Sequence, residues 1–429
     1  MALKGHFQDG HDFLTQAFDG QASAALVRED YCESNRDRIH STDGVYRNLI
    51  PVNDVEHSLC QLARWRRQVF QKPVIGITGS VGKTSTKEML GYLLTKRWNG
   101  LIGKGNFNNE LGLPINLIGL DSDHDFCLTE LGASKPGDIR YLSDILKPSY
   151  AMITQISEAH LEGFGSIEAV YSTKLELAEA LPTGGICVLP DFDRVLIEKA
   201  ARLDRKFILV GSTEGAHYRV SGVRQEKNNV IFNLAGRQTY RIPAGAPFFA
   251  QNAAMAAALA DQLGFALEKQ PPVWEDFNLP AGRFECRRAG EGITLIYDGY
   301  NASPESFRRS IEGFRQMNIE GRKLVLFADM LELGTEKDRL HREIGKMLSE
   351  ADFDLVGAYG VSALRALEEV CRGSHRGMVK SFESPEEAGD FFASELKLGD
   401  ALLLKASRSM RIDKALKIIE EFLNQNCRQ

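Results

Sequence analysis

The segment ITGSVGKTSTKEML, residues 77–90, limits the possible folds of this chain more than any other stretch. A short apolar run leads into a turn flanked by two glycines, and Lys83 and Thr84 then open a helix-like sequence. Glycine lets backbone N–H groups approach an anion closely, and a helix N-terminus adds partial positive charge. The strand, the turn and the helix start together predict a phosphate-binding loop in an α/β domain.

Each position of this loop has an expected role. Lys83 is expected to neutralise charge on the β- and γ-phosphates, and the Thr84 hydroxyl to bind Mg²⁺. The alternative is a plain glycine turn with a solvated lysine, and the flanking strand and helix argue against it. The common nucleotide loop, G-x-x-x-x-G-K-[ST], needs a glycine at position 77, where this chain has isoleucine. We therefore expect a variant nucleotide loop made of Gly79, Ser80, Val81, Gly82, Lys83, Thr84 and Ser85.

Strand-like and helix-like segments alternate after Pro73, the pattern of a parallel sheet with helices on both faces. An alanine-rich helix at 246–264 is expected to close this unit, and the Pro-rich segment 268–285 is a predicted linker. A second, smaller α/β domain is expected beyond it. The predicted strands are 74–78, 126–131, 150–157, 184–190 and 206–211 before the linker, and 294–298, 323–329, 353–360 and 400–407 after it.

Bulk properties exclude several classes of protein. A length of 429 residues favours two or three domains. A net charge of −6 argues against broad binding of nucleic acid or anionic membranes. No run of eighteen apolar residues and no signal-peptide pattern is present, so no membrane span is expected. The seven cysteines are odd in number and form no C-x-x-C, which predicts reduced thiols in a cytoplasmic protein.

The loop pattern T-G-S-x-G-K-T resembles that of the Mur ligase family, ATP-dependent enzymes that form amide bonds in cell-wall synthesis, and of their folylpolyglutamate synthase relatives. Further motifs resemble the family in the same order along nearly the whole chain. The phrases ELGAS, HLEGFGS, YNASP, DMLELG and SRSMR are similar to the branch that adds D-alanyl-D-alanine. The matching segments are 105–114, 128–142, 157–177, 282–285, 297–307, 328–334 and 403–416.

The resemblance implies a three-domain Mur ligase architecture of the α/β class. It comprises a truncated N-terminal domain for the UDP-substrate (1–72), a central P-loop parallel-sheet ATPase domain (73–280) and a Rossmann-like C-terminal domain for the incoming amino acid or dipeptide (281–429). The implied reaction adds D-alanyl-D-alanine to UDP-N-acetylmuramoyl tripeptide through an acyl phosphate, with ATP and two Mg²⁺ ions. The implied partners are these small molecules, and we expect a monomer that binds no nucleic acid.

Three residues are implied metal ligands besides Thr84. Glu130 ends an apolar strand, where parallel sheets place ligands, and its carboxylate suits Mg²⁺; a solvated strand-end charge is the alternative. His160, by itself most simply a structural or surface histidine, matches the family's ligand of a second Mg²⁺. Lys174, by itself most simply a surface lysine, matches a lysine that CO₂ carbamylates. Such a lysine needs a lowered pKa so that the neutral amine is available.

The resemblance also implies the nucleotide contacts. Asn252, in the alanine-rich helix, matches a residue that bonds the adenine, although the histidine usual upstream is missing and Phe248 lies nearby. Arg283 resembles the arginine that reaches the ATP phosphates when the domains close. Asp298 resembles the acid that holds the ribose. Each of these has an ordinary alternative as a helix-surface, linker or strand-end residue.

Substrate contacts are expected on both sides of the linker. Asn108 and Asn109 are expected to position the acyl group of the substrate, with an ordinary asparagine-rich turn as the alternative. Ser407 and Arg408 are suspected contacts, and a basic helix start explains them nearly as well. Lys83 and the implied metal ligands complete the expected catalytic set.

The start of the chain departs from the family. Family members carry several strands before the segment similar to residues 2–17, and these help to bind the uridine nucleotide. A misassigned start codon, a truncated sequence and a genuine variant are the three explanations, in that order of preference. Two other functions remain open: a Mur-like ligase that joins different partners, and an inactive scaffold, against which the intact Lys83, Glu130, His160 and Lys174 argue.

Overall fold

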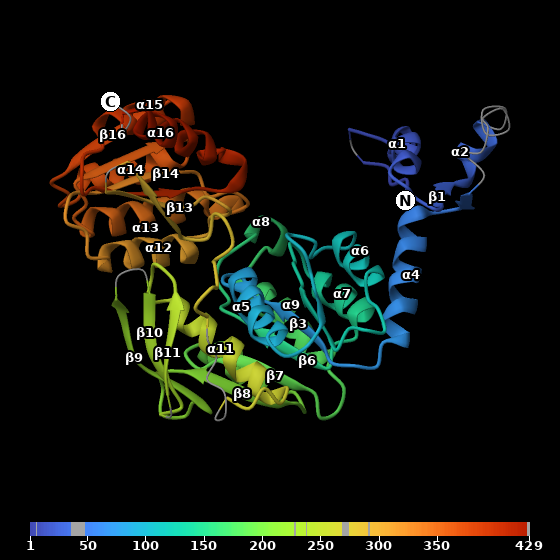
Figure 1. Cartoon of the computed structure of the whole chain (residues 1–429). Coiled ribbons are helices and arrows are strands. Elements are labelled where there is room, and N and C mark those ends of the chain that lie inside the picture. Colours follow the sequence, from blue (N-terminus) through green and yellow to red (C-terminus); the bar gives the residue numbers. More distant parts are fainter. Residues whose placement is uncertain are drawn as a thin grey trace.

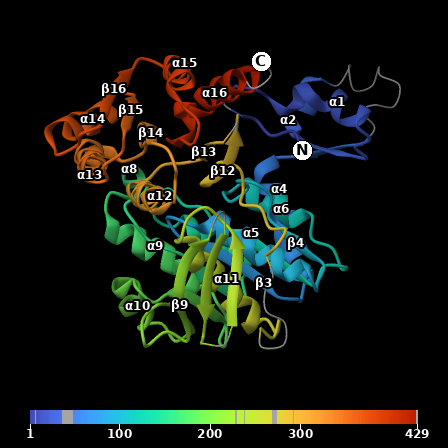
Figure 2. The same cartoon turned by 60° about the vertical axis from the view of Figure 1, so that its left-hand side comes forward.

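The chain folds into three successive regions, coloured from blue to red along the sequence in Figure 1. They are a small N-terminal unit, a middle region with a nine-stranded sheet and a C-terminal region with a six-stranded sheet. In both Figure 1 and Figure 2 the first and last regions lie above the middle one. The computed structural model describes residues 1–5, 7–35, 48–226, 229–236, 238–267, 274–290 and 292–426.

The N-terminal unit has a small apolar core and a two-stranded parallel sheet. Its elements are η1 (Gly10–Phe13), α1 (Leu14–Asp19), β1 (Ala25–Arg28), α2 (Glu29–Ser34) and β2 (Leu49–Val52). Helix α4 (Val55–Val69) then leads to the middle region, as Figure 1 shows. Arg67 near its end donates to the carbonyl of Leu146 at 2.6 Å, so α4 is fixed to the middle region.

The middle sheet has the order β11-β10-β9-β8-β7-β6-β3-β5-β4. The strands from β3 to β8 run parallel, as predicted for all of them except β4, which was not predicted, because their apolar residues are buried by helices on both faces. Three further strands continue the sheet, the last two antiparallel, and were not predicted. The strands are β3 (Val74–Thr78), β4 (Gly100–Ile102), β5 (Phe126–Glu130), β6 (Tyr150–Ile153), β7 (Ile186–Pro190), β8 (Lys206–Gly211), β9 (Tyr218–Glu226), β10 (Asn229–Leu234) and β11 (Gln238–Pro243).

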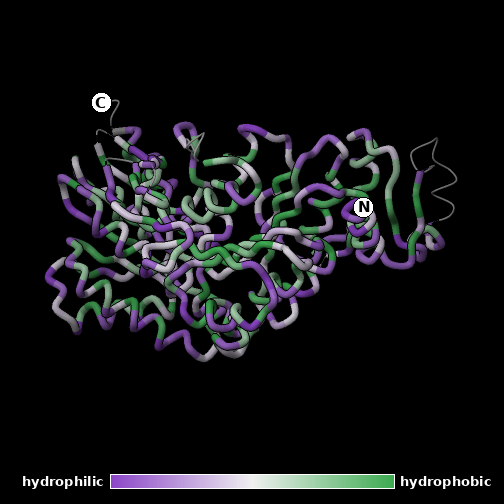
Figure 3. The backbone as a smooth tube through the Cα atoms, turned by 90° about the horizontal axis from the view of Figure 1, so that it is seen from below, coloured by the Kyte–Doolittle hydropathy of each residue, from purple (hydrophilic) through white to green (hydrophobic). Residues whose placement is uncertain are grey.

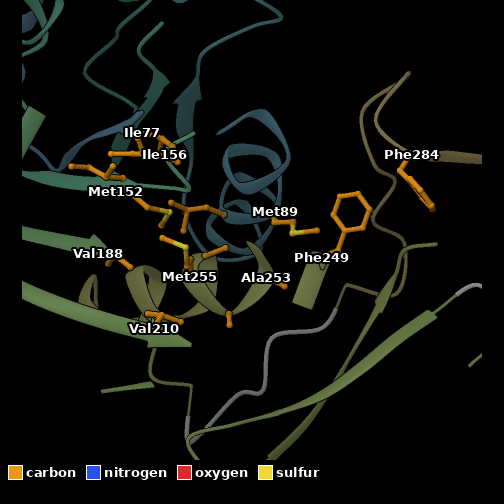
Figure 4. Close-up of a cluster of buried hydrophobic side chains, with 14 of the residues drawn as sticks. Ile77, Met89, Met152, Ile156, Val188, Val210, Phe249, Ala253, Met255 and Phe284 are labelled. Carbon is orange, nitrogen blue, oxygen red and sulfur yellow. The ribbon is translucent and has the colours of Figure 1, made fainter. Parts of the chain in front are cut away.

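Helices α5 and α11 pack against each other on one face of this sheet, and α7 and α9 pack against each other and against β3. Figure 4 shows the core between the first pair and the strands, where Met255 lies near Met152 and Met89 lies beside Phe249. The small side chains of α11 allow this helix to approach the sheet closely. The helices are α5 (Lys83–Thr95), α6 (Gly112–Ile118), α7 (Asp138–Leu146), α8 (Leu161–Phe164), α9 (Ile167–Glu179), α10 (Arg194–Ala200) and α11 (Phe249–Gln262).

The C-terminal sheet has the order β12-β13-β17-β14-β15-β16, with only β12 antiparallel to its neighbour. Its four central strands were predicted, and the edge strands β12 and β16 were not. Figure 3 shows hydrophobic residues gathered in the interior of the molecule and hydrophilic residues at many of the outer turns. The elements are β12 (Glu285–Ala289), β13 (Ile293–Asp298), α12 (Pro304–Gln316), β14 (Lys323–Ala328), η2 (Gly334–Glu336), α13 (Lys337–Glu350), β15 (Leu355–Tyr359), α14 (Ala363–Arg372), β16 (Met378–Phe382), α15 (Pro385–Glu395), β17 (Ala401–Lys405), η3 (Arg408–Met410) and α16 (Ile412–Asn426).

The predicted linker is irregular in its described part, residues 274–284, and residues 268–273 lie outside the described residues. This part is firmly anchored, because Trp274 is fully buried and its indole N–H donates to the carbonyl of Met89 at 3.4 Å. The chain therefore returns from α11 across α5 before it enters the C-terminal sheet.

The described part of the chain bears on two expectations, the lack of a membrane span and the reduced state of the cysteines. No helix there combines the length and the apolar character that crossing a bilayer requires. The six cysteines described there are free thiols, as predicted; Cys427 lies outside the described residues.

Candidate functional site

The predicted phosphate loop joins a buried strand to a helix, as its sequence indicates. All five residues of β3 are buried, and Gly82, with φ of 91°, is the N-cap of α5. Gly79 has φ of 144°, and a Cβ there would lie 2.0 Å from the hydroxyl oxygen of Thr154. A side chain at Gly79 would therefore collide with β6 and its following turn, which explains why the loop needs glycine at this position.

Lys83 folds back over the loop. Its ammonium donates to the carbonyl of Gly79 at 2.9 Å and, more weakly, to that of Ser80 at 3.4 Å. Burial lowers the pKa of Lys83, with the nearby Glu130 carboxylate opposing the shift. A cation held over a loop at a helix N-terminus is the arrangement that binds a nucleotide phosphate.

Glu130 is the centre of a polar cluster at the end of β5. One of its carboxylate oxygens accepts from the Thr84 hydroxyl at 2.7 Å, and the other accepts from the Asn108 amide at 2.8 Å. Arg283 donates to the same Thr84 hydroxyl at 3.1 Å. Burial alone would raise the pKa of Glu130, but Lys83 and the Thr84 hydrogen bond outweigh it, so the pKa is lowered. The cluster thus holds a buried, ionised carboxylate next to the phosphate loop.

Lys174 is buried on α9, so the simple interpretation of it as a surface lysine is wrong. Only 2% of the residue is exposed, and its Nζ lies 5.7 Å from the centre of the Phe164 ring. Burial lowers the pKa of Lys174 to about 7, and repulsion by Lys83 adds to the shift. The amine is therefore substantially neutral near neutral pH, which is the condition for its reaction with CO₂.

His160 lies between the middle and C-terminal regions. Its backbone is left-handed, with φ of 54°, and its Nδ1 bonds to the carboxylate of Glu332. Burial lowers the pKa of the imidazole, Glu332 opposes the shift, and Lys83 adds to it. With Nδ1 bonded to Glu332, Nε2 is the nitrogen left for another ligand.

The predicted nucleotide contacts surround a narrow pocket of about 70 Å³ between the two regions. Asn252 is buried on α11, and a Cβ at Gly82 would lie 3.3 Å from its side-chain oxygen. Asp298, at the end of β13, lies 2.7 Å from the Lys405 ammonium and accepts from the Ser310 hydroxyl at 2.5 Å. The structure thus brings the expected adenine and ribose residues to the same pocket, with Asp298 already held by donors of its own region.

A larger cleft of about 770 Å³ opens beside this pocket. Its walls include residues from the phosphate loop, the strand ends and the linker. Asn109 also lines the cleft, but its side-chain oxygen accepts from the Gly112 N–H at 2.8 Å and so orders the start of α6. The predicted residues that line the cleft are Ser80, Lys83, Asn108, Asn109, Glu130, His160 and Arg283.

A third pocket, of about 100 Å³, lies between the middle and C-terminal regions beside His160. Ser407 and Arg408, which were suspected substrate contacts, line it. The Ser407 hydroxyl accepts from the N–H of Leu331 at 3.0 Å, so it also fixes the loop that carries Glu332.

Three residues of the site were not singled out from the sequence. Glu332 lies within the motif DMLELG, and its left-handed backbone, with φ of 62°, directs it to His160. Lys405 is the lysine that ends the apolar strand at 401–405, and this position could have indicated a buried charge near the site. Gln155 accepts at its carbonyl from the N–H of Ser80 at 2.8 Å, and its amide donates to Glu305 of the C-terminal region at 2.6 Å.

The chain is similar to known proteins over almost its whole length. The family model of the Mur ligase middle domain matches residues 77–260, and that of the Mur ligase, glutamate ligase domain matches residues 282–408. The UDP-N-acetylmuramoyl-tripeptide–D-alanyl-D-alanine ligase of Bacillus subtilis (strain 168) is 30% identical over 98% of this chain and 89% of its own length. That of Escherichia coli (strain K12) is 28% identical over 98% and 90%.

Solved structures of proteins with similar names are also similar to this chain over almost its whole length. The crystal structure of the MurF ligase from Thermotoga maritima in complex with ADP superimposes with a TM-score of 0.82 at 28% identity, covering 99% of this chain and 94% of that one. The crystal structure of MurF from Acinetobacter baumannii superimposes with a TM-score of 0.83 at 29% identity, covering 98% and 90%.

Proposed function

This chain belongs to the Mur ligase family, and from that premise we propose that it joins D-alanyl-D-alanine to UDP-N-acetylmuramoyl tripeptide at the expense of ATP. The observation that carries the proposal is the cluster of Lys83, Thr84, Glu130 and Arg283 at the head of the phosphate loop. This cluster opens into the cleft of about 770 Å³, which is large enough for a substrate carboxylate to meet ATP.

The reaction proceeds in two steps. A carboxylate oxygen of the tripeptide attacks the γ-phosphorus of ATP, and the bond from this phosphorus to the bridging oxygen breaks. ADP departs, and the tripeptide is left as an acyl phosphate. The amine of D-alanyl-D-alanine then attacks the acyl carbon, loses a proton and expels inorganic phosphate. Phosphoryl transfer depends mainly on positioning and on neutralising charge, and Lys83 and Arg283, which both contact residues of the loop, would supply that charge.

The residues around Glu130 fit a Mg²⁺ ion. A buried, ionised carboxylate and a hydroxyl are hard oxygen ligands, and Thr84 and Glu130 would share the ion with ATP phosphates and water. The described residues contain no group of three or more His, Cys, Asp or Glu side chains that could hold a metal alone, which agrees with a site completed by ATP. The ion would supply positive charge to the γ-phosphoryl group.

For a second Mg²⁺ ion we propose His160 and a carbamylated Lys174. A lysine cation does not bind Mg²⁺, whereas its carbamate would present an anionic oxygen. The burial of Lys174 and its pKa of about 7 support the modification. Lys174→Ala is expected to lose activity and to regain part of it when a short carboxylic acid is added. An active Lys174→Ala enzyme would exclude this role.

The substrates are assigned to the regions by the residues that each presents. We propose that residues 1–72 bind the UDP end of the tripeptide substrate, 73–280 bind ATP, and 281–429 bind the dipeptide. Asn108, which bonds Glu130, is proposed to orient the reacting carboxylate with Asn109, and Asn252 and Asp298 to hold the adenine and ribose. Ser407 and Arg408, in the pocket beside His160, are proposed to contact the dipeptide. A cytoplasmic location and a monomeric state are also part of the proposal; the free thiols support the former.

The test is phosphate release from ATP with UDP-linked muramoyl tripeptide, with and without D-alanyl-D-alanine. We expect release that depends on both substrates and a product in which the dipeptide is amide-linked. Release with a different amino acid in place of the dipeptide would instead identify a ligase of other specificity. ATP binding without any release would favour the scaffold alternative.

A further inference from the structure

We propose that Tyr300 is a positioning residue, whose ring face holds the Arg283 guanidinium where it meets the ATP phosphates. Tyr300 follows β13 in the C-terminal region and lines the cleft of about 770 Å³ together with Lys83 and Arg283. The inference deepens the proposed function and rests on it, because it takes Arg283 as a phosphate contact.

Arg283 has few contacts of its own. Its guanidinium carbon lies 4.0 Å from the centre of the Tyr300 ring, and one terminal nitrogen donates to the Thr84 hydroxyl at 3.1 Å. Its Nε is buried without a hydrogen-bond partner, and within the described residues no carboxylate forms an ion pair with it. Within the described residues, the Tyr300 ring and the Thr84 hydroxyl are therefore the contacts that orient this guanidinium.

The charges around Arg283 make such a support necessary. Burial lowers the pKa of both Lys83 and Lys405, and Arg283 adds to the lowering of each, which reports mutual repulsion among the three cations. Glu130 attracts Arg283, but both of its carboxylate oxygens already accept hydrogen bonds from Thr84 and Asn108. An aromatic face stabilises a cation without neutralising it, so Arg283 keeps its full charge for an incoming phosphate.

The backbone holds the ring and the guanidinium in register. The N–H of Tyr300 donates to the carbonyl of Gly282 at 3.2 Å, one residue before Arg283. Gly282 has φ of 71°, and a Cβ there would lie 3.3 Å from the Cβ of Tyr300. The carbonyl of the next residue, Asn301, accepts from the Lys405 ammonium at 2.9 Å. The turn that carries Arg283 thus lies directly on the residue that supports its side chain.

A competing interpretation is that Tyr300 contacts the acceptor substrate itself, since it lines the cleft and Arg408 lies 5.7 Å from the same ring. The two interpretations differ in what each variant should change. Support of Arg283 needs only an aromatic face and acts on nucleotide affinity. Contact with the acceptor would instead act on the KM for the tripeptide and would persist without Arg283.

The experiment compares Tyr300→Leu, Tyr300→Phe, Arg283→Ala and the double variant Tyr300→Leu/Arg283→Ala in the full chain. The readouts are the dissociation constant of ADP with Mg²⁺, measured calorimetrically, and the KM values for ATP and tripeptide. Phe391→Leu is the matched control, because the Lys380 ammonium lies 3.8 Å from the centre of that ring in the C-terminal region, away from the cleft.

Tyr300→Leu is expected to raise the ADP dissociation constant and the KM for ATP by about 5- to 30-fold, the range of a partly desolvated cation–π contact. Tyr300→Phe should restore values close to those of the unmodified protein, and Phe391→Leu should leave both unchanged. The double variant should bind ADP no more weakly than Arg283→Ala, because the ring acts through the guanidinium.

Additive losses in the double variant, or a raised tripeptide KM with unchanged ADP affinity, would overturn the proposal. The ADP measurement needs no ligation. A chain that binds ADP but releases no phosphate with D-alanyl-D-alanine would therefore contradict the proposed function, while the Tyr300 comparison would still be decided.

Discussion

Lys174 in the middle region and Lys405 in the C-terminal region are both buried lysines near the cleft, but only one is paired. Lys405 lies 2.7 Å from the Asp298 carboxylate, whereas the Lys174 ammonium lies 5.7 Å from the centre of the Phe164 ring and forms no ion pair within the described residues. A buried charge without a partner is costly and is retained where chemistry needs it, whereas a buried pair orders its surroundings. The middle region thus presents reactive groups, and the C-terminal region presents a preassembled surface.

The largest expected effect is the loss of phosphoryl transfer when a reactive group of the middle region is removed. Lys83→Ala should lower kcat by about 10²–10³-fold, because it removes a preorganised charge at the γ-phosphoryl group. Phosphate release under saturating substrates measures the loss. Lys96→Ala at the end of the same helix is the control, since Lys96 lies over the ring of Tyr92, away from the loop. Equal activity of Lys83→Ala and Lys96→Ala would contradict the assignment of the loop.

The next largest effect tests the buried pair of Asp298 and Lys405 in the C-terminal region. Asp298→Ala should destabilise the C-terminal region by about 3–5 kcal/mol, because it leaves the Lys405 charge buried and unpaired. Hydrogen exchange of the β13 and β17 amides measures the loss, and the added change Lys405→Met should recover much of it. Lys174→Met is the counterpart and should not destabilise the middle region. A similar loss from both variants would remove the distinction between the two lysines.

A smaller effect follows from the pKa of Lys174. Its folded pKa is about 7 and its ordinary value is 10.5, so between these values the unfolded chain binds more protons. The free energy of unfolding contributed by this group therefore rises with pH across that window and is lost as pH falls toward 7. Urea unfolding in CO₂-depleted buffer at several pH values should show this dependence. Lys174→Met should flatten it, and an unchanged slope would contradict the assigned pKa.

The smallest effect concerns an exposed ion pair between the middle and C-terminal regions. Arg339 bonds Glu158 at 2.9 Å, and both side chains are substantially exposed. Arg339→Ala should change stability by less than about 1 kcal/mol, because water screens such pairs. Thermal unfolding at low and high salt measures it. A large loss would show that the regions are held together at the surface rather than by their buried residues.

Most of the fold followed from patterns in the sequence, and the failures share a physical cause. Apolar strands such as β3 and β5 were predicted because both faces are buried, so their residues are apolar throughout. Strand β9 and the edge strand β12 were missed because consecutive charged and polar residues interrupt their apolar ones, and pairing with neighbours decides their conformation. Strand β4 has only three residues, too few for a pattern.

The sequence by itself determined the phosphate loop, the order of the apolar strands and the family, because these depend on local spacing and on residue identity. Only the tertiary structure decided which charges are paired. The neighbours of Lys174 along the chain favoured an ordinary surface lysine, and only the family resemblance implied a carbamylated metal ligand. Burial by segments distant in sequence lowers its pKa and so changes its chemistry. Tyr300 over Arg283 and Glu332 against His160 likewise exist only once the regions pack, since desolvation and contact between distant residues are properties of the folded state.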